Sequence, residues 1–215
     1  IIADGKNDDQ EGTASSTKVK YKGRFCVHGH KITQLRRYVS RQATPLTATD
    51  TLPDLWSPVA SLSSSRLCLA HGLVNNYQVD SIDLASAFLQ VSWQDTSSGD
   101  HFLTLDNTAR DLFRDPLMTG RHLRKPCWKM LKCIYGHPLS GTTFARKLLS
   151  CLSDNGWSAA SSCAALLHKS RCRVVIYVDD VLVSGPEDEK AELYALLREK
   201  GFSIGGSPGR CTRFL

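Results

Sequence analysis

Two adjacent aspartates, Asp179 and Asp180, stand between two short runs of mostly β-branched residues near the C-terminal end of the chain. The runs, residues 173–178 and 181–183, are joined so closely that they predict a tight β-hairpin with both carboxylates at its tip. Like charges at that spacing repel, and Mg²⁺ removes the cost because it binds carboxylate oxygens, water and substrate phosphates together. With a third carboxylate, the pair would suit phosphoryl transfer. The alternative is an ordinary turn, in which aspartate faces water.

A third carboxylate can come from residues 77–84, which alternate in polarity as a strand does. Successive side chains of a strand point to opposite faces, so Asp83 and Asp80 are expected on different faces. The face of Asp83 also carries Tyr77, Val79 and Ser81, and the face of Asp80 carries Ile82 and Leu84.

Helical periodicity marks the elements that support these strands. Helices are predicted over residues 54–72, with Pro58 in the first turn, over residues 141–152, and over residues 186–200, with Pro186 in the first turn and Gly201 after the end. A strand is expected within residues 18–28 and another near Leu166, and the polar residues 1–17 predict a linker. The mixture predicts an α+β fold in which a central antiparallel sheet is backed by helices packed on one face.

Composition narrows the class of protein. The chain has 215 residues, 41% hydrophobic and 22% charged, which is usual for a folded globular protein. Its net charge of +6 is compatible with a polyanionic partner. The eight cysteines form no C-x-x-C pair, which disfavours a zinc module or a disulfide framework. No apolar run approaches the roughly 20 residues of a transmembrane helix. We therefore expect reduced thiols in a cytosolic protein without a membrane partner.

Several blocks of the sequence resemble the reverse transcriptases of copia-type LTR retrotransposons. Tyr177-Val178-Asp179-Asp180 resembles their Y-x-D-D box, and Ile82-Asp83-Leu84-Ala85-Ser86-Ala87-Phe88-Leu89 is similar to their D-V-x-x-A-F-L block. Further blocks, in the family's order, are Lys22-Gly23-Arg24-Phe25-Cys26-Val27, Trp56-Ser57-Pro58-Val59-Ala60, Ile134-Tyr135-Gly136 and Arg213-Phe214-Leu215. The resemblance extends from about Tyr21 to the last residue.

This resemblance implies an RNA-directed DNA polymerase in which Asp83, Asp179 and Asp180 bind Mg²⁺, or Mn²⁺ in its place. In the family, one ion activates the primer 3′-hydroxyl and the other holds the incoming deoxynucleoside triphosphate. Asp80 is not part of this triad, because its spacing to Phe88 does not fit the block and it faces away from Asp83.

The resemblance also implies nucleotide contacts. Phe88 takes the place of the aromatic gate that collides with a ribose 2′-hydroxyl, and the alternative is a core aromatic. The backbone from Leu84 through Ala87 to Phe88 is expected to turn into a helix start whose N–H groups bind phosphate oxygens. Lys22 and Arg24 resemble the basic residues that grip the triphosphate, although an exposed pair on a strand is an equal alternative.

Contacts with nucleic acid are expected from a second set of side chains. Basic and aromatic residues together suit a nucleic-acid backbone, although the lysines equally suit a solvated face. The expected residues are Tyr177, Lys129, Lys132 and Arg213.

The chain departs from the family after Tyr135-Gly136. Copia-type enzymes continue L-K-Q-A-P-R-x-W, whereas this chain has His137-Pro138-Leu139-Ser140-Gly141. The usual glutamine, which contacts nucleotide and template, falls on Leu139. Either His137 or backbone groups of Ser140 and Gly141 replace that contact, or the copy has decayed.

The sequence thus predicts a right-hand polymerase with palm segments at about 77–95 and 141–215 and fingers segments at about 18–76 and 96–140. Its expected partners are an RNA template, a DNA primer and product, and the rest of a Pol polyprotein, with integrase upstream and the thumb and RNase H downstream. We expect a cytoplasmic location within virus-like particles, or a nuclear one, and weak activity of this thumbless segment alone. The alternatives are a non-catalytic retroelement remnant that at most binds nucleic acid and, less favoured, a metal-dependent nuclease.

Overall fold

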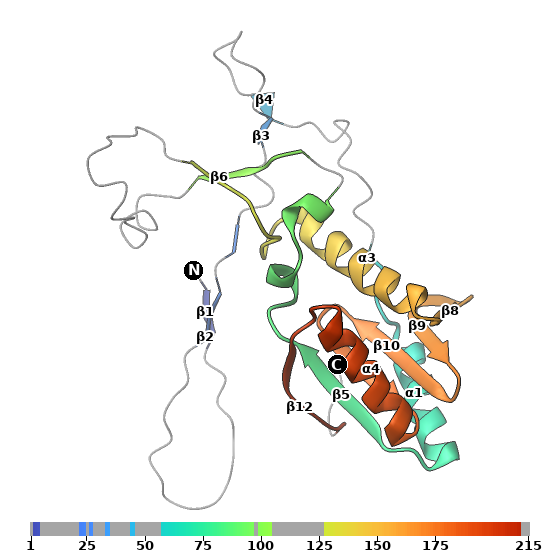
Figure 1. The fold of residues 1–215 in the computed structure, drawn as a ribbon. Coiled ribbons are helices and arrows are strands. Elements are labelled where there is room, and N and C mark those ends of the chain that lie inside the picture. Colours follow the sequence, from blue (N-terminus) through green and yellow to red (C-terminus); the bar gives the residue numbers. More distant parts are fainter. Residues whose placement is uncertain are drawn as a thin grey trace, which may run out of the picture.

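The computed structural model describes residues 26–27, 57–96, 99–104 and 127–211, except the side chain of Ser207, together with the backbone pairing of four short strands before residue 46. A six-stranded sheet with the order β12-β5-β11-β10-β9-β8 forms its centre (Figure 1). All neighbouring strands are antiparallel. The strands are β5 (Val79–Leu84), β8 (Ser158–Ala160), β9 (Cys163–Lys169), β10 (Cys172–Tyr177), β11 (Asp180–Ser184) and β12 (Ile204–Arg210). The α+β class and the antiparallel sheet predicted from the sequence are confirmed.

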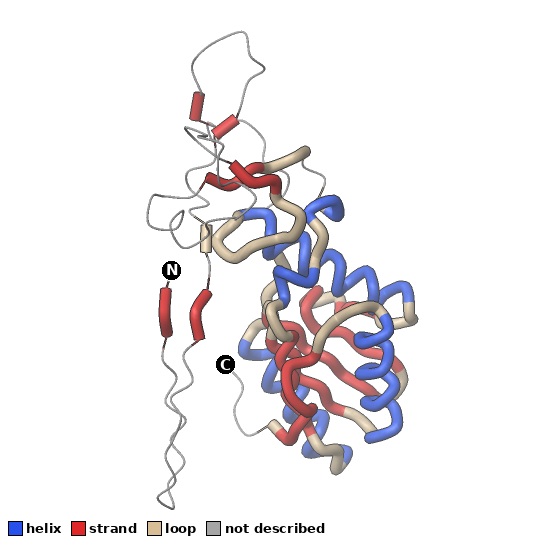
Figure 2. The backbone as a smooth tube through the Cα atoms, turned by 60° about the vertical axis from the view of Figure 1, so that its left-hand side comes forward, coloured by secondary structure: helices blue, strands red, loops and turns tan. Residues whose placement is uncertain are grey.

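Helices cover both faces of this sheet, and the prediction that they pack on one face was wrong. Helix α1 (Leu62–Asn75) contacts β5, β9, β10 and β11, while α3 (Pro138–Asp154) and α4 (Glu187–Glu199) lie on the opposite side (Figures 1 and 2). The reason lies in the central strands, because β10 and β11 are buried at most positions, on both faces. A strand that is buried on both faces needs helices on both sides of the sheet. A strand that alternates between apolar and polar residues needs them on one side only.

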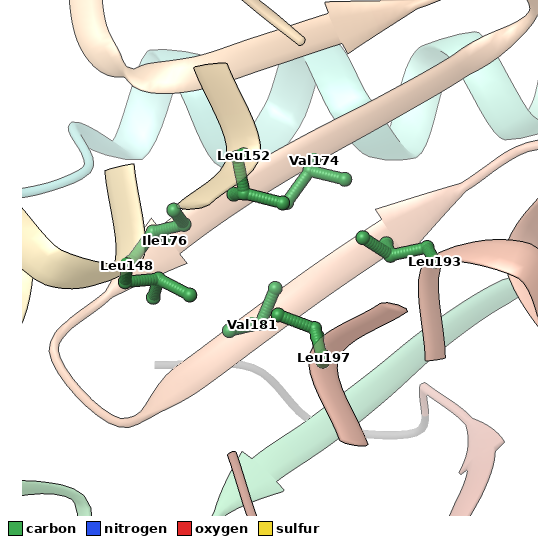
Figure 3. Close-up of a pocket in the computed structure, with 7 residues that line it drawn as sticks. All are labelled: Leu148, Leu152, Val174, Ile176, Val181, Leu193 and Leu197. Atoms are coloured by element: carbon green, nitrogen blue, oxygen red, sulfur yellow. The ribbon is translucent and has the colours of Figure 1, made fainter. Parts of the chain in front are cut away.

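The larger core lies between the sheet and helices α3 and α4. Figure 3 shows its centre, where leucines from the two helices meet valines and an isoleucine of β10 and β11 without leaving room for a water molecule. The side chains at this seam are Leu148, Leu152, Val174, Ile176, Val181, Leu193 and Leu197. This packing fixes the β10–β11 hairpin from behind and leaves its tip at the edge of the core.

Helix α1 packs on the other face through small residues. Its inward positions are Ser64, Ser65, Cys68 and Gly72, and a Cβ on Gly72 would lie 2.3 Å from Cγ2 of Val79. The helix begins at Leu62 with Ser61 as N-cap, so the predicted start near residue 54 with Pro58 in its first turn was wrong. A serine cap satisfies the free N–H groups there. Residues 62–75 thus pack on the central sheet, and their predicted assignment to the fingers stays a prediction.

The other two helices agree more closely with the sequence. Helix α3 has His137 as N-cap and Pro138 at its first position, and so begins before the predicted residue 141. Helix α4 has Pro186 as N-cap rather than in its first turn, and Gly201 follows it with φ +84°. Within the described residues, no helix has the length and apolar character needed to cross a membrane.

Smaller elements complete the described structure. They are the 3₁₀ helices η2 (Ala87–Gln90) and η3 (Trp93–Asp95) and the antiparallel pairs β1 (Ile2–Asp4) with β2 (Lys22–Arg24), β3 (Thr33–Gln34) with β4 (Thr44–Pro45), and β6 (Phe102–Thr104) with β7 (Cys127–Lys129). Strand β2 falls where the sequence predicts a strand. Strand β1 falls within residues 1–17, predicted as a linker, whose other residues lie outside the described structure.

Candidate active site

One row of cross-strand neighbours brings the Y-x-D-D box and the D-V-x-x-A-F-L block together. Tyr177 on β10 is opposite Asp180 on β11, Asp180 is opposite Asp83 on β5, and Asp83 is opposite Gly205 on β12. Directly opposed residues of an antiparallel pair have Cβ atoms about 4.5–5.5 Å apart and point to the same face. Two aspartates from distant parts of the chain are therefore neighbours on one face, at the end of the sheet where β10 turns into β11.

The hairpin turn also brings Asp179 to β5. Its carbonyl oxygen accepts a hydrogen bond of 2.8 Å from the N–H of Leu84. Val178, between Tyr177 and Asp179, has φ +57°, a left-handed conformation that costs a β-branched residue about 1–2 kcal/mol. The hydrogen bond and the buried hairpin strands hold this strained turn against the strand that carries Asp83.

These carboxylates suit a hard divalent cation by their chemistry. Asp83 is exposed and Asp179 and Asp180 are half-buried, so all three are accessible to water. Mg²⁺ prefers carboxylate oxygens and keeps room for water and phosphate. Over the described part of the chain, however, no three His, Cys, Asp or Glu side chains are grouped so that they could hold a metal ion together. The structure brings Asp83 and Asp180 together, and convergence of the whole triad on one metal site stays a prediction.

Asp80 is a structural residue on the opposite face of β5. Its carboxylate accepts hydrogen bonds from Lys190 Nζ at 2.7 Å and from the Tyr194 hydroxyl at 2.9 Å. Lys190 is completely buried and also forms an ion pair with Glu187 at 2.7 Å. Burial raises the pKa of Asp80, but the hydrogen bonds from Lys190, Gln78 and Tyr194 outweigh it and hold the net pKa below its usual value. The exclusion of Asp80 from the metal ligands thus has a clear physical basis.

The Phe88 ring lies in η2, just beyond β5. It packs against Tyr135 with ring centroids 5.0 Å apart and edge-on against Phe144 at 6.1 Å, yet it is only partly buried. The ring is therefore held in place while part of it stays accessible, so it has features of both the gate and the core aromatic.

The backbone before Phe88 differs from the expected helix start. Residues 87–90 form a single 3₁₀ turn preceded by Ser86 in a left-handed conformation. The side chains of Leu84 and Ala87 are buried, and the N–H of Leu84 already donates to Asp179. Leu84 therefore has no free N–H for a phosphate, whichever residues of the turn contact a nucleotide.

The expected nucleic-acid contacts are spread over several elements. Lys129 on β7 is exposed and forms an ion pair with Asp100 at 2.7 Å. Lys132 is exposed, and half-buried Tyr177 packs against the core under α1. Arg213 lies outside the described residues, as do the side chains of Lys22 and Arg24 on β2. The structure thus leaves these assignments as predictions.

The divergent loop after Gly136 has a structural role. His137 Nδ1 accepts from the N–H of Leu139 at 3.2 Å, and its Nε2 lies 3.0 Å from Nδ1 of His101. The Ser140 hydroxyl donates to the Ile134 carbonyl and its N–H donates to the His137 carbonyl. Leu139 is buried in the core. Neither His137 nor the N–H of Ser140 is free to replace the family's glutamine.

The histidine pair predicts a loss of stability in weak acid. Burial lowers the pKa of His137 to about 4, with a further contribution from His101. The unfolded chain has the usual histidine pKa near 6.5, so it binds more protons than the folded state between those values. We expect the free energy of unfolding to fall by on the order of 3 kcal/mol as the pH drops from about 6.5 to about 4. Urea unfolding at several pH values measures it.

A matched pair of variants isolates this effect. His137→Asn keeps a capping side chain and should flatten the pH dependence, whereas His168→Asn, at an exposed histidine of β9, should not. Equal pH dependence of the wild type and His137→Asn would refute the assignment.

Two residues beside the site were missed by the sequence analysis. Gly205 faces Asp83 from β12, and Gln90 hydrogen-bonds the backbone of Ser203, the residue before that strand. The segment Gly205-Gly206-Ser207-Pro208-Gly209 has the composition of a turn, which hid an edge strand. An irregularity between Gly205 and Gly209 lets this strand bend and still pair with β5.

A family model and solved structures match this chain. The family model described as reverse transcriptase (RNA-dependent DNA polymerase), whose members are of the Ty1/copia type, matches residues 9–204. No curated protein sequence matches the chain. A solved structure of telomerase from Candida albicans, in complex with a fragment of telomeric RNA, matches with a TM-score of 0.35 and 12% identity over 68% of this chain. The match spans only 30% of the telomerase chain. By the extent of the family match, this chain belongs to the reverse transcriptase family of Ty1/copia-type retrotransposons.

Proposed function

We propose that this domain is the templated DNA polymerase of a copia-like element, which adds deoxynucleotides to a primer 3′-hydroxyl on an RNA or DNA template. The observation that carries the proposal is the opposition of Asp83 and Asp180 at the hairpin turn that bears Asp179. Membership of a family of RNA-dependent DNA polymerases supports the same function. The sheet with its three helices would be the palm, and the β6–β7 hairpin would belong to the fingers.

In this proposal Asp83, Asp179 and Asp180 hold Mg²⁺, or Mn²⁺ in its place, which neutralises charge on the transferred phosphate and acidifies the primer hydroxyl. The protein contributes position. Asp83 and Asp180 extend from paired strands of a buried sheet, and Asp179 is fixed by the hydrogen bond of its carbonyl to Leu84. Ligands on rigid elements are held more precisely than ligands on loops.

Primer extension tests the proposal directly. The purified chain is given poly(rA)/oligo(dT) and dTTP with Mg²⁺ or Mn²⁺, and addition of the first nucleotide is measured so that processivity does not matter. We expect addition with either ion and none in EDTA. A chain that binds the primer–template but adds no nucleotide with either ion would contradict the proposal and favour a non-catalytic remnant.

Phe88 should contribute to the choice of sugar. Its ring is fixed by Tyr135 and Phe144, so a ribose 2′-hydroxyl that meets it cannot push it aside at low cost. Replacing it by valine should reduce discrimination against ribonucleotides by about 1–3 kcal/mol, or roughly 10- to 200-fold. The ratio of dTTP to UTP incorporation measures it.

Phe102 on β6 offers a matched aromatic control, because it is 48% exposed. Phe102→Val should leave the incorporation ratio unchanged. Identical ratios in the Phe88→Val variant and the wild type would mean that Phe88 is only a packing residue.

A further inference from the structure

At Gly205, strand β12 passes the carboxylate of Asp83 more closely than a side chain at that position would permit. A Cβ on Gly205 would lie 2.5 Å from Oδ2 of Asp83 and 3.4 Å from its Cγ. Non-bonded heavy atoms separate at about 3.5–4.0 Å, so that Cβ and the carboxylate could not share the space. The φ angle of Gly205 is not in the left-handed region, so the backbone conformation at this position does not require glycine. The space beside Asp83 explains the residue.

Gln90 holds the chain in place two residues before Gly205, where it enters β12. Its Oε1 accepts from the N–H of Ser203 at 2.9 Å, and its Nε2 donates to the carbonyls of Ser203, at 3.3 Å, and of Ala85. The N–H of Ala85 in turn donates to the carbonyl of Ser203 at 2.9 Å. One amide side chain from η2 thus joins the residue that follows β5 to the residue that precedes β12.

We infer that Gly205 and Gln90 are positioning residues that set where the Asp83 carboxylate lies for its cation. Gly205 leaves the space that the carboxylate occupies, and Gln90 joins the two strands at the adjacent ends, two residues from the Gly205–Asp83 pair. The inference rests on the proposed function, since it takes Asp83 to be a metal ligand. Partners that orient a metal ligand typically contribute 10- to 100-fold to metal affinity.

Binding of Mn²⁺ to the purified chain, followed by the electron paramagnetic resonance signal of the free ion, tests this without catalysis. We expect Gly205→Ala to weaken Mn²⁺ binding by about 10- to 100-fold, and Gln90→Leu by about 10-fold. Thermal unfolding is measured on the same samples. We expect both variants to remain folded at the temperature of the binding measurement, so that the loss of Mn²⁺ affinity is not caused by unfolding.

Each variant has a neighbour of the same type as its control. Gly206 has φ +71°, and no atom lies within 4 Å of the place that its Cβ would take, so Gly206→Ala should lower the melting temperature and leave Mn²⁺ affinity intact. Gln94 is exposed on η3, so Gln94→Leu should change neither. Equal loss of affinity in Gly205→Ala and Gly206→Ala would overturn the inference, because strand strain would then suffice.

Asp83→Asn separates this inference from the proposed function. If Asp83→Asn leaves Mn²⁺ binding unchanged, Asp83 is not a ligand and the proposed function fails together with the inference. If Asp83→Asn abolishes binding while Gly205→Ala and Gln90→Leu have no effect, only the inference fails. In the Asp83→Asn background, Gly205→Ala should cause no further loss, since its effect acts through that carboxylate.

Discussion

Replacing Asp83 by asparagine should reduce nucleotide addition by roughly a thousandfold or more without destabilising the domain. In the proposed function this carboxylate is a metal ligand whose contribution to charge neutralisation is worth several kcal/mol, and each 1.36 kcal/mol is tenfold in rate. In the fold, however, it stands opposite Asp180, and opposed like charges destabilise a sheet by about 0.2–1 kcal/mol. Asparagine keeps the shape and removes the repulsion. Single-turnover addition of one nucleotide and thermal unfolding measure the two effects.

The opposite signs make this prediction specific. Replacing an aspartate with a structural role would destabilise the domain. Replacing a metal ligand that is held beside another carboxylate should reduce activity and leave the stability of the domain intact. Asp154→Asn, at an exposed aspartate in the last turn of α3, is the control and should leave activity unchanged. Undiminished nucleotide addition by Asp83→Asn, or a loss that follows unfolding, would refute the assignment.

Replacing Lys190 by methionine should cost about 3–5 kcal/mol of unfolding free energy, because it leaves Asp80 as a buried charge without its ion-pair partner. Lys190 is fully buried and Asp80 nearly so. Burial lowers the pKa of Lys190, but hydrogen bonds to Asp80 and Glu187 outweigh it and raise the net value. The contribution of the lysine is therefore complete below about pH 10.4 and is lost as the pH rises through the folded pKa.

The acid limb has the reverse sign. The folded pKa of Asp80 is lowered, so its contribution is complete above about pH 3.9 and is lost as the pH falls through the folded value. Urea unfolding at pH 7 therefore measures the whole effect of the pair.

A double variant and an exposed lysine complete the test. Asp80→Asn combined with Lys190→Met removes both charges and keeps an acceptor for the Tyr194 hydroxyl, so it should recover much of the lost stability. Lys200→Met, at an exposed pair with Glu199, should cost at most about 1 kcal/mol. A cost as small for Lys190→Met would show that the buried pair is not important for stability.

The sequence predicted the parts of the fold whose pattern is local. Strand β5, the β10–β11 hairpin and helix α4 were all expected close to their observed bounds. Their patterns are, in the same order, alternating polarity, two adjacent β-branched runs, and helical spacing between a proline and a glycine, and each leaves few alternatives. The opposite facing of Asp80 and Asp83 followed from the two-residue period and agrees with their burial.

What the sequence could not predict depends on contacts between distant segments. The small residues on the inner face of α1 give no apolar stripe, so neither its start nor its side of the sheet was evident. From the sequence, Lys190 belongs to a charged face of a helix, and only the structure shows that it is paired with Asp80. The register that places Gly205 beside Asp83 depends on strand pairing, which the residue types in β12 do not determine.

The order of the sheet has a consequence for how the chain folds during synthesis. Strand β5 lies between β11 and β12, which both follow it much later in the sequence (Figure 1). Contacts between distant segments form slowly, because a long loop must close before they contribute any stability. Helices α3 and α4 and the β10–β11 hairpin can begin from local contacts, but Asp83 lacks its full set of strand neighbours until residue 204 and its successors have left the ribosome. We expect the surroundings of Asp83, between β11 and β12, to be the last part of this domain to form.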